Sequence, residues 1–347
     1  MFVEISPDPK CYQIYKRQII IGICIAIACI LIIVIPTVIV TKKKKSKGQE
    51  KNQDESQNQN NSDQNTNPDE TRASLCGYEN GKIKRNCYGG WFYKAYKYPA
   101  DKLAQYAKQL GWEYAFLSLS SSESKLAQTI QLCKLFSENG IHVHWMTLED
   151  YDTYLVDENG VQHATTQISK VMKIINDNSL PVSGIHIDTE PHGCEAWKNC
   201  GEDYNCRNPI FQQYIKVIEE SQKIISQRPK TLFSAAVAWW YPQKSKEGLL
   251  QNGRGYDLVQ NGRLDLVVPM IYDGAGGTIQ KVVKRMQDYL GDNVPTVAGM
   301  DVQDYNSEFT DAWMGVTNEL ISNSSFYGVS IYSQERYPEW ETFISNF

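Results

Sequence analysis

Three ionisable residues occupy alternate positions in a short apolar segment. They are His186, Asp188 and Glu190, within Gly184-Ile-His-Ile-Asp-Thr-Glu-Pro-His192. Alternate residues of a β-strand share a face, so the three side chains are expected to point the same way. An unpaired charge is costly to bury, and perturbed carboxylates gather at active sites. The row therefore favours acid–base chemistry at the C-terminal end of a strand over a structural ion network.

The segment belongs to a regular alternation of strand-like and helix-like stretches. Eight apolar runs are expected to form strands, at 90–93, 114–118, 142–146, 184–188, 232–238, 264–272, 296–300 and 328–332. Amphipathic stretches predict helices at 100–110, 124–138, 165–176, 209–226, 245–250, 278–290 and 311–322. Eight such units in about 260 residues match a (β/α)8 TIM barrel. A doubly wound sheet is the alternative, but the Gly-rich phosphate loop expected after its first strand is not found.

The C-terminal ends of barrel strands form the active site in this fold, so further site residues are expected there. The candidates that close the fifth to eighth strands are Trp239, Trp240, Tyr241, Tyr272, Asp273, Asp301 and Tyr332. Aromatic rings around carboxylates are typical of sugar-binding sites, although aromatic residues at strand ends can equally belong to the core. Adjacent strand residues such as Trp239 and Trp240 cannot both point inward.

Two of these segments resemble the signatures of glycoside hydrolase family 18, the chitinase-like enzymes. Ser183-Gly-Ile-His-Ile-Asp-Thr-Glu190 is similar to D-G-x-D-x-D-x-E, and Pro269-Met-Ile-Tyr-Asp273 to M-x-Y-D. Their order and spacing agree over residues 87–340. The resemblance implies a (β/α)8 glycosidase without a cofactor, whose substrate is a β-linked glycan containing N-acetylhexosamine.

The resemblance also implies roles for individual residues. Glu190 would protonate the glycosidic oxygen, and Asp188 would orient the 2-acetamido group of the substrate, which is the nucleophile in this family. Tyr272 and Asp273 would surround that acetamido group. The remaining candidates for substrate binding are His186, Trp239, Met270, Asp301 and Tyr332.

Three departures from the family pattern concern the substrate cradle. Ser183 and His186 stand where the family has aspartates, and a protonated His186 would lower the pKa of Asp188. The stretch 141–146 lacks the family's S-x-G-G. Tyr332 stands where the family typically has a tryptophan.

Two other functions remain open. His142 and His144, with His186, Asp188 and Glu190, supply ligand types that suit zinc in a barrel hydrolase. A surface lectin that kept the sugar groove but lost turnover is the non-enzymatic alternative. Retention of Glu190 argues against the lectin.

The N-terminal region differs from the rest in composition. Residues 19–40 are apolar and uncharged, long enough to cross a bilayer, and longer than the apolar part of a signal peptide. Residues 46–72 contain no aliphatic or aromatic residue. We expect a short tail at 1–18, a transmembrane helix at 19–41, a disordered stalk at 42–74 and the barrel at 75–347.

The charge distribution bears on partners and on orientation. Residues after 47 carry a net charge of −11, which disfavours nucleic-acid binding. The lysines at 42–45 and 47 would place the barrel in the cytosol by the positive-inside rule. Three features instead favour a type II protein with an extracellular or lumenal barrel. Six of the nine cysteines follow the stalk, which suits an oxidising compartment, glycosylation sequons occur at Asn60 and Asn323, and a polar stalk would hold the barrel away from the membrane.

The cysteines of the barrel region predict two braces. Cys76 and Cys87 are expected to close a small loop before the first strand. Disulfides are also expected among Cys194, Cys200 and Cys206, with one of the three left over. Cys133 lies on an apolar helix face and is expected to be a buried free thiol.

Overall fold

The computed structural model describes residues 73–272, 277–305, 309–332 and 340. The tail and membrane span expected at 1–18 and 19–41, and all but the last two residues of the stalk, lie outside these residues, as does Asp273. Within the described ranges no helix combines the length and apolar character needed to cross a membrane.

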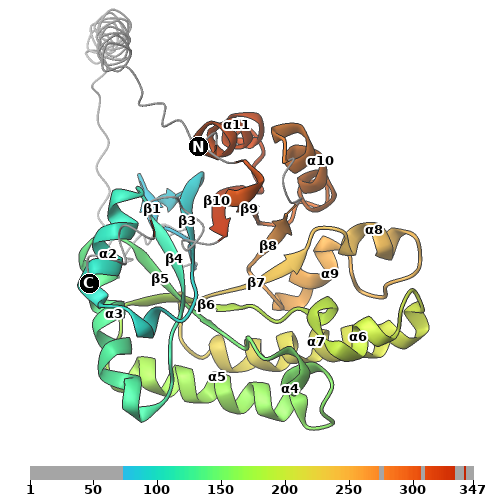
Figure 1. The fold of residues 1–347 in the computed structure, drawn as a ribbon, viewed down its shortest axis with the longest axis horizontal. Helices are drawn as coiled ribbons and strands as arrows, with labels where there is room; N and C mark the ends of the chain where they lie inside the picture. Colours follow the sequence, from blue (N-terminus) through green and yellow to red (C-terminus); the bar gives the residue numbers. More distant parts are fainter. Residues whose placement is uncertain (1–72, 273–276, 306–308, 333–339, 341–347) are drawn as a thin grey trace, which may run out of the picture. The chain divides into compact units, whose positions relative to one another are not determined.

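Eight parallel strands close into a barrel, in the order β10-β3-β4-β5-β6-β7-β8-β9 (Figure 1). The strands are β3 (Cys87–Phe92), β4 (Tyr114–Ser118), β5 (His142–Thr147), β6 (Val182–Ile187), β7 (Leu232–Ala238), β8 (Leu266–Ile271), β9 (Thr296–Asp301) and β10 (Phe326–Tyr332). A two-stranded antiparallel hairpin, β1 (Tyr78–Glu79) and β2 (Lys82–Ile83), precedes the barrel. The predicted (β/α)8 fold is confirmed, and each of the eight predicted strands overlaps a strand of the barrel.

Helices surround the barrel and link successive strands (Figure 1). The α-helices are α2 (Ala100–Gln109), α3 (Leu126–Glu138), α4 (Tyr151–Leu155), α5 (Gly160–Asp177), α6 (Glu195–Asn199), α7 (Tyr204–Ile225), α8 (Tyr241–Lys246), α9 (Gly255–Val259), α10 (Ile279–Leu290) and α11 (Phe309–Leu320). The short 3-10 helices are η2 (Ala95–Lys97), η3 (Glu123–Lys125), η4 (Pro191–Gly193), η5 (Gln260–Gly262) and η6 (Val302–Asp304).

Two helices begin five residues earlier than the sequence predicts. The amphipathic pattern predicts that one of them begins at Pro209. The structure instead begins α7 at Tyr204, where the side chain of Asp203 accepts a hydrogen bond from the backbone N–H of Asn205. Pro209 is thus inside the helix. Helix α5 begins at Gly160, five residues before the predicted start.

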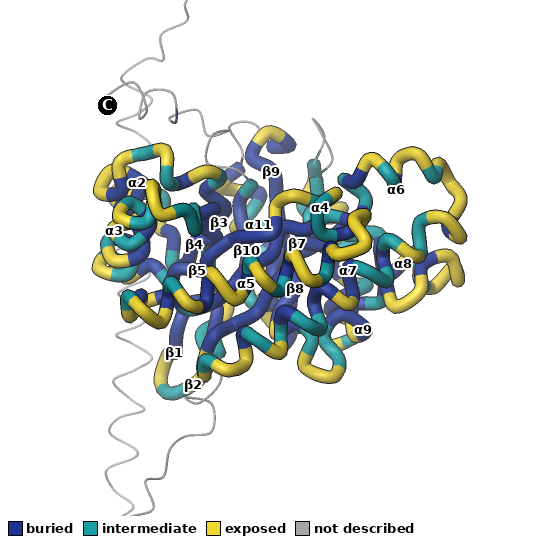
Figure 2. The backbone as a smooth tube through the Cα atoms, turned by 90° about the horizontal axis from the view of Figure 1, so that it is seen from below, coloured by how far each residue is buried: buried dark blue, intermediate teal, exposed yellow. Residues whose placement is uncertain are grey.

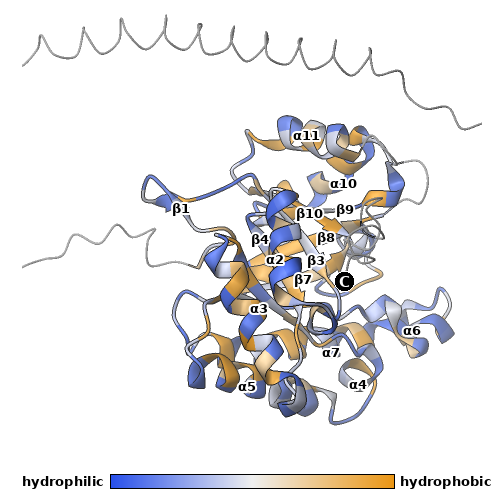
Figure 3. Ribbon diagram, turned by 60° about the vertical axis from the view of Figure 1, so that its left-hand side comes forward, coloured by the Kyte–Doolittle hydropathy of each residue, from blue (hydrophilic) through white to orange (hydrophobic). Residues whose placement is uncertain are grey.

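The apolar residues form two layers of core. The larger layer lies between the strands and the helices and includes Ile185 and Ile187, which have no exposed surface. The smaller layer fills the barrel and includes Leu75, Trp91 and Phe116. The strands are buried and the outer sides of the helices exposed (Figure 2), with the hydrophobic residues gathered on the strands (Figure 3). Alternate strand residues therefore serve different layers, as their period of two requires.

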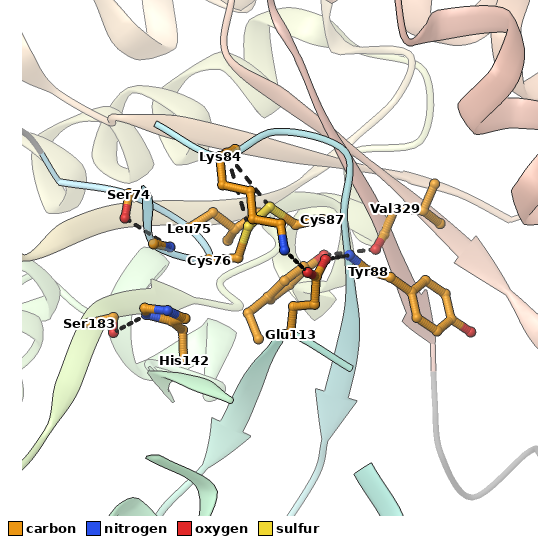
Figure 4. The surroundings of a disulfide bond; sticks show 12 residues. Ser74, Leu75, Cys76, Lys84, Cys87, Tyr88, Glu113, His142, Ser183 and Val329 are labelled. Carbon is orange, nitrogen blue, oxygen red and sulfur yellow. Dashed lines mark hydrogen bonds and ion pairs between the residues drawn. A yellow bond between two sulfur atoms is a disulfide. The ribbon is translucent and has the colours of Figure 1, made fainter. Parts of the chain in front are cut away.

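The N-terminal end of the barrel, here called the floor, is closed by the chain before β3 (Figure 4). A disulfide joins Cys76 to Cys87 and Lys84 forms an ion pair with Glu113. The carbonyl oxygen of Leu75 lies 2.8 Å from Nε2 of His144, inside the barrel. The predicted loop-closing disulfide is confirmed.

The other cysteines of the barrel region are either paired in a disulfide or present as free thiols. Cys200 forms a disulfide with Cys206 across the link between α6 and α7, and Cys194 is the free thiol left over among the three. Cys133 is a buried free thiol on α3, as its apolar neighbours predict.

Candidate active site

A cavity of about 540 Å³ opens at the C-terminal ends of the strands, here called the mouth. It is lined by Tyr93, Tyr151, Asp188, Glu190, His192, Ala238, Trp239, Trp240, Met270, Tyr272, Asp301 and Tyr332. These residues follow or end β3, β5, β6, β7, β8, β9 and β10. The mouth thus combines three carboxyl groups with six aromatic side chains.

Asp188 is the buried carboxyl of the mouth, with 2% of its surface exposed. The hydroxyl of Tyr93 donates a 2.8 Å hydrogen bond to its Oδ2, whereas its Oδ1 has no hydrogen-bond partner among the described residues. Loss of solvent and then the charge of Glu190 raise the pKa of Asp188 to about 8, against the effect of the Tyr93 bond. Asp188 therefore holds a proton at neutral pH.

Glu190 follows β6 and is held by donors from two other loops. The hydroxyl of Tyr151, at the start of α4, donates to Oε1 at 3.3 Å. Nε2 of His192 lies 3.2 Å from Oε2, and Nδ1 of the same ring lies 3.0 Å from the hydroxyl of Tyr241. The Glu190 side chain keeps 19% of its surface exposed, so it reaches the cavity.

The aromatic wall of the mouth comes from three strand ends. Tyr272 and Tyr332 stack with their ring centroids 4.8 Å apart, and Tyr93 meets the edge of Tyr332 at 5.8 Å. Loss of solvent raises the pKa values of Tyr93 and Tyr272 well above the ordinary value, so both hydroxyls keep their protons. The Arg285 guanidinium lies 3.9 Å from the ring centroid of Trp239, which is in the turn after β7.

His186 does not reach the cavity, which corrects its assignment to substrate binding. It has no exposed surface and stacks on Phe116 with ring centroids 3.8 Å apart. Strand residues two apart share a face but lie about 6.6 Å apart along the strand. His186 therefore occupies the layer of side chains below Asp188.

The protonation of His186 also differs from the expectation. Trp91 Nε1 donates to His186 Nε2 at 3.1 Å, and an indole nitrogen can only donate. The ring proton therefore sits on Nδ1, which donates to the hydroxyl of Ser234 at 2.9 Å. Burial lowers the pKa of His186 well below its ordinary value, so the ring is neutral and cannot lower the pKa of Asp188 as a cation would.

The remaining predicted residues fall at the mouth, except Asp273, which lies outside the described residues. Met270 and Asp301 line the cavity, and Asp301 accepts a hydrogen bond from the backbone N–H of Gln303. Trp239 and Trp240 both line it, although adjacent strand residues cannot share a face. They can do so because β7 ends at Ala238 and the two residues lie in the turn after it.

Three residues that line the cavity were not predicted as site residues: Tyr93, Tyr151 and His192. Tyr241, predicted only as one of the aromatic residues that close the fifth strand, contacts His192. Tyr93 directly follows β3, and Tyr241 begins α8. His192 lies only two residues after Glu190. The available signal was the position of each residue at the end of a predicted strand or shortly after it. Because the hydrogen-bond partners belong to different loops, residue spacing does not show which side chains touch.

The ligand set proposed for zinc is divided between the two ends of the barrel. His142 Nδ1 lies 3.0 Å from the hydroxyl of Ser183 at the floor, and His144 Nε2 lies 2.8 Å from Leu75 O. Among the described residues, the one group of His, Cys, Asp and Glu atoms close enough to share a metal is Cys76, Cys87 and Glu113. Its two cysteines are already joined as a disulfide. The geometry does not support the zinc alternative.

No protein-family model and no curated protein sequence matches the chain. Solved structures are similar to it in fold. A GH18 chitinase from Pseudoalteromonas aurantia matches 75% of this chain and 99% of its own, with a TM-score of 0.51 and 14% identity. The exo-beta-1,4-mannosidase Op5Man5 from Opitutaceae bacterium strain TAV5 matches 79% of this chain and 57% of its own, with a TM-score of 0.53 and 10% identity. These similarities establish the TIM-barrel fold.

Proposed function

We propose that the chain is a glycoside hydrolase that cleaves a β-linked glycan containing N-acetylhexosamine. The observation that carries the proposal is the pair Asp188 and Glu190 in one cavity, with one carboxyl buried and protonated and the other exposed to the cavity. Two carboxyls with different environments are what acid–base cleavage of a glycoside requires. The two similar structures are a chitinase and a mannosidase, which supports the same class.

The mouth can hold a sugar through its aromatic rings and its buried carboxyl. Tyr272, Tyr332 and Trp239 offer faces and edges to the apolar side of a pyranose ring. Asp188 Oδ1 is buried and unpartnered among the described residues, and a substrate N–H would satisfy it. An acetamido group is the sugar substituent that supplies such an N–H next to the reacting carbon.

The proposed reaction moves one proton between the two carboxyls. In the free protein the proton sits on Asp188. Binding of the acetamido N–H favours the Asp188 carboxylate, and the proton passes to Glu190. Glu190 then protonates the glycosidic oxygen while the acetamido oxygen attacks the anomeric carbon and the bond to the leaving sugar breaks. Water opens the cyclic intermediate and returns its proton to Glu190, which retains the β configuration.

The test is release of reducing sugar from chitin oligomers, peptidoglycan and mixed glycans by the full chain and by Glu190→Gln. Glutamine is nearly isosteric but cannot donate a carboxyl proton, so activity should fall about 1000-fold or more. Glu195→Gln, an exposed glutamate five residues on, is the matched control and should keep wild-type activity. Turnover by Glu190→Gln within a few-fold of wild type contradicts the assignment of the acid.

Beta-mannan belongs in the same panel because one similar structure is a mannosidase. A mannose substrate has no acetamido group, so a second carboxylate would have to be the nucleophile. Asp301 is the described candidate at the mouth, while Asp273 and Glu335 lie outside the described residues. Cleavage of mannan without cleavage of chitin oligomers would overturn the substrate-assisted mechanism but retain the hydrolase.

Glycan binding without turnover is a second candidate function. It is favoured by the contacts of Glu190, since both carboxyl oxygens already lie close to donor groups of the protein, on Tyr151 and His192, and neither is left to the substrate alone. Wild-type protein that binds N-acetylhexosamine oligomers in calorimetry yet releases no reducing sugar over a day would establish this alternative.

We also propose that residues 19–41 anchor the chain in a membrane as a type II protein, with the barrel outside or in a lumen. The disulfides Cys76–Cys87 and Cys200–Cys206 support this, because disulfides persist in oxidising compartments. Protease added to intact cells should digest the barrel if the protein is at the cell surface. Protease added to sealed microsomes should spare the barrel if it is lumenal. A barrel exposed on the cytosolic side contradicts the orientation.

A further inference from the structure

The loop after β6 places an imidazole between Glu190 and a buried phenol. His192 approaches Glu190 Oε2 through Nε2 at 3.2 Å and the Tyr241 hydroxyl through Nδ1 at 3.0 Å. Tyr241 begins α8 and has 1% of its surface exposed. The ring edge of His192 also packs against Trp240 and Tyr241, at centroid distances of 5.7 and 5.9 Å. The imidazole is thus packed in position, with a hydrogen-bond partner at Nδ1 and a carboxyl oxygen near Nε2.

The contacts of Tyr241 decide which ring nitrogen carries the proton. Burial raises the pKa of Tyr241 well above the ordinary value, so its hydroxyl keeps its hydrogen. The buried Tyr241 hydroxyl has Nδ1 of His192 at 3.0 Å as an acceptor for this hydrogen. Nε2 of the same ring faces Glu190 Oε2 at 3.2 Å, where a carboxyl oxygen favours a ring proton on Nε2. A neutral imidazole that accepts at Nδ1 carries its proton at Nε2.

On this basis we propose that His192 is a positioning residue for Glu190, with Tyr241 fixing its tautomer. The inference rests on the proposed function of Glu190 as proton donor. Nε2–H of His192 donates to Oε2, while the Tyr151 hydroxyl donates to Oε1 at 3.3 Å. One donor on each oxygen fixes the plane of the carboxyl, and a positioned proton donor needs a fixed plane.

The same contact acts after the proton has left. Once Glu190 has protonated the glycosidic oxygen it is a carboxylate, and a hydrogen bond to an ionised acceptor is stronger than one to a neutral acid. In the substrate complex the proton has passed to Glu190, so His192 stabilises the carboxylate that forms during the reaction more than it stabilises that complex. An interaction of that kind raises kcat.

Three variants of the full chain test the role in turnover. His192→Ala should lower kcat about 10- to 100-fold without a rise in KM. His192→Gln, whose amide N–H can reach the same oxygen, should recover most of that loss. Tyr241→Phe should lower kcat about fivefold, because the ring proton is then free to sit on either nitrogen. His163→Ala, an exposed histidine of α5, is the control and should match wild type.

The tautomer is measured without substrate, from the ring ¹⁵N shifts of His192, identified among the five histidines by its absence in His192→Gln. A proton on Nε2 in wild type, and a mixture of tautomers in Tyr241→Phe, support the proposal. A proton on Nδ1 in wild type, or a loss in His192→Ala that appears in KM alone, overturns it. Wild type that cleaves no glycan refutes the proposed function, while the tautomer separately reports on the His192 contact.

Discussion

The two ends of the barrel both contain histidines, yet the groups around them differ. At the mouth, His192 contacts a carboxyl that lines the cavity, and the neighbouring Asp188 has an oxygen without a partner among the described residues. At the floor, His142 and His144 contact a serine hydroxyl and a backbone carbonyl under a disulfide-closed loop. The floor uses its polar groups to hold the chain together, and the mouth leaves its own available for a ligand. Barrel enzymes divide stability and activity between their ends in this way.

The largest expected effect comes from the buried carboxyl of the mouth. Asp188→Asn keeps an acceptor for the Tyr93 hydroxyl but can neither hold nor release the shared proton. We expect glycan cleavage to fall at least 100-fold, measured as kcat/KM on the best substrate of the panel. Activity close to wild type would mean that the mouth does not use its buried carboxyl, and the contrast with the floor would fail.

Asp188 should also affect how stability depends on pH, in the direction opposite to that of most aspartates. Asp188 has a folded pKa of about 8, above its ordinary value of 3.8, so unfolding releases a proton between those values and wild-type stability falls as pH rises. The asparagine side chain of the variant does not titrate. The Tm of Asp188→Asn minus that of wild type should therefore rise from about pH 4 to about pH 8 and stay constant above that range. Parallel Tm curves across this range would contradict the raised pKa.

The next prediction concerns His186, which lies in the layer of side chains below the mouth and should affect stability. His186→Leu leaves Trp91 Nε1 and the Ser234 hydroxyl without their partner, so we expect a loss of about 4 kcal/mol in the free energy of unfolding. Chemical denaturation measures it, with His163→Leu on the exposed face of α5 as control. A raised KM with unchanged stability would instead return His186 to the binding site.

The neutral histidines of the interior also predict acid sensitivity. Burial holds the pKa of His144 at about 4 and that of His186 well below the ordinary 6.5. Both rings take up a proton on unfolding, so stability should fall as pH drops below about 6.5. The His186→Leu variant should show a shallower fall over the same range.

Removing the disulfide of the floor should lower the stability of the protein but leave its activity nearly unchanged. Replacing Cys76 and Cys87 by serine removes a cross-link that closes a loop of 11 residues, which should cost about 3 kcal/mol in the free energy of unfolding. At a temperature where the variant stays folded, kcat should remain within about twofold of wild type. A large loss of kcat in folded protein would show that the floor and the mouth are coupled.

The smallest effect concerns one close approach at the mouth. A Cβ on Gly193 would lie 2.5 and 2.6 Å from ring carbons of Tyr151, so Gly193→Ala must displace the ring that donates to Glu190. We expect kcat to fall about fivefold, which corresponds to about 1 kcal/mol. Tyr151→Phe should give a similar loss, and the double variant should be little worse than either single one. Additive losses would show that Gly193 acts by another route.

The fold was predictable because its signals are local and repeated. The apolar runs at 114–118 and 232–238 coincide with β4 and β7. Period-two alternation correctly placed Ile185 and Ile187 in the outer core and the row from His186 to Glu190 on the inner face. Cys76 and Cys87 lie close enough in sequence that their pairing could be inferred as well.

The arrangement of the site was predictable only in part, because depth and partner choice are properties of the assembled barrel. Residues on one strand face occupy different layers, so His186 became an interior residue while Asp188 reached the mouth. The contact between His192 and Tyr241 joins the loops after β6 and β7, 49 residues apart. No spacing within either loop specifies that contact.

The link between the hairpin and β3 has a mechanical consequence. The Cys76–Cys87 bond lies between the start of the described chain and the first barrel strand. Tension transmitted from residue 73 would pass through the two sulfur atoms directly into β3, and the residues between them would bear no load. A pulling force on the N-terminal side would therefore act first on the floor, at the end of β3 opposite to the mouth.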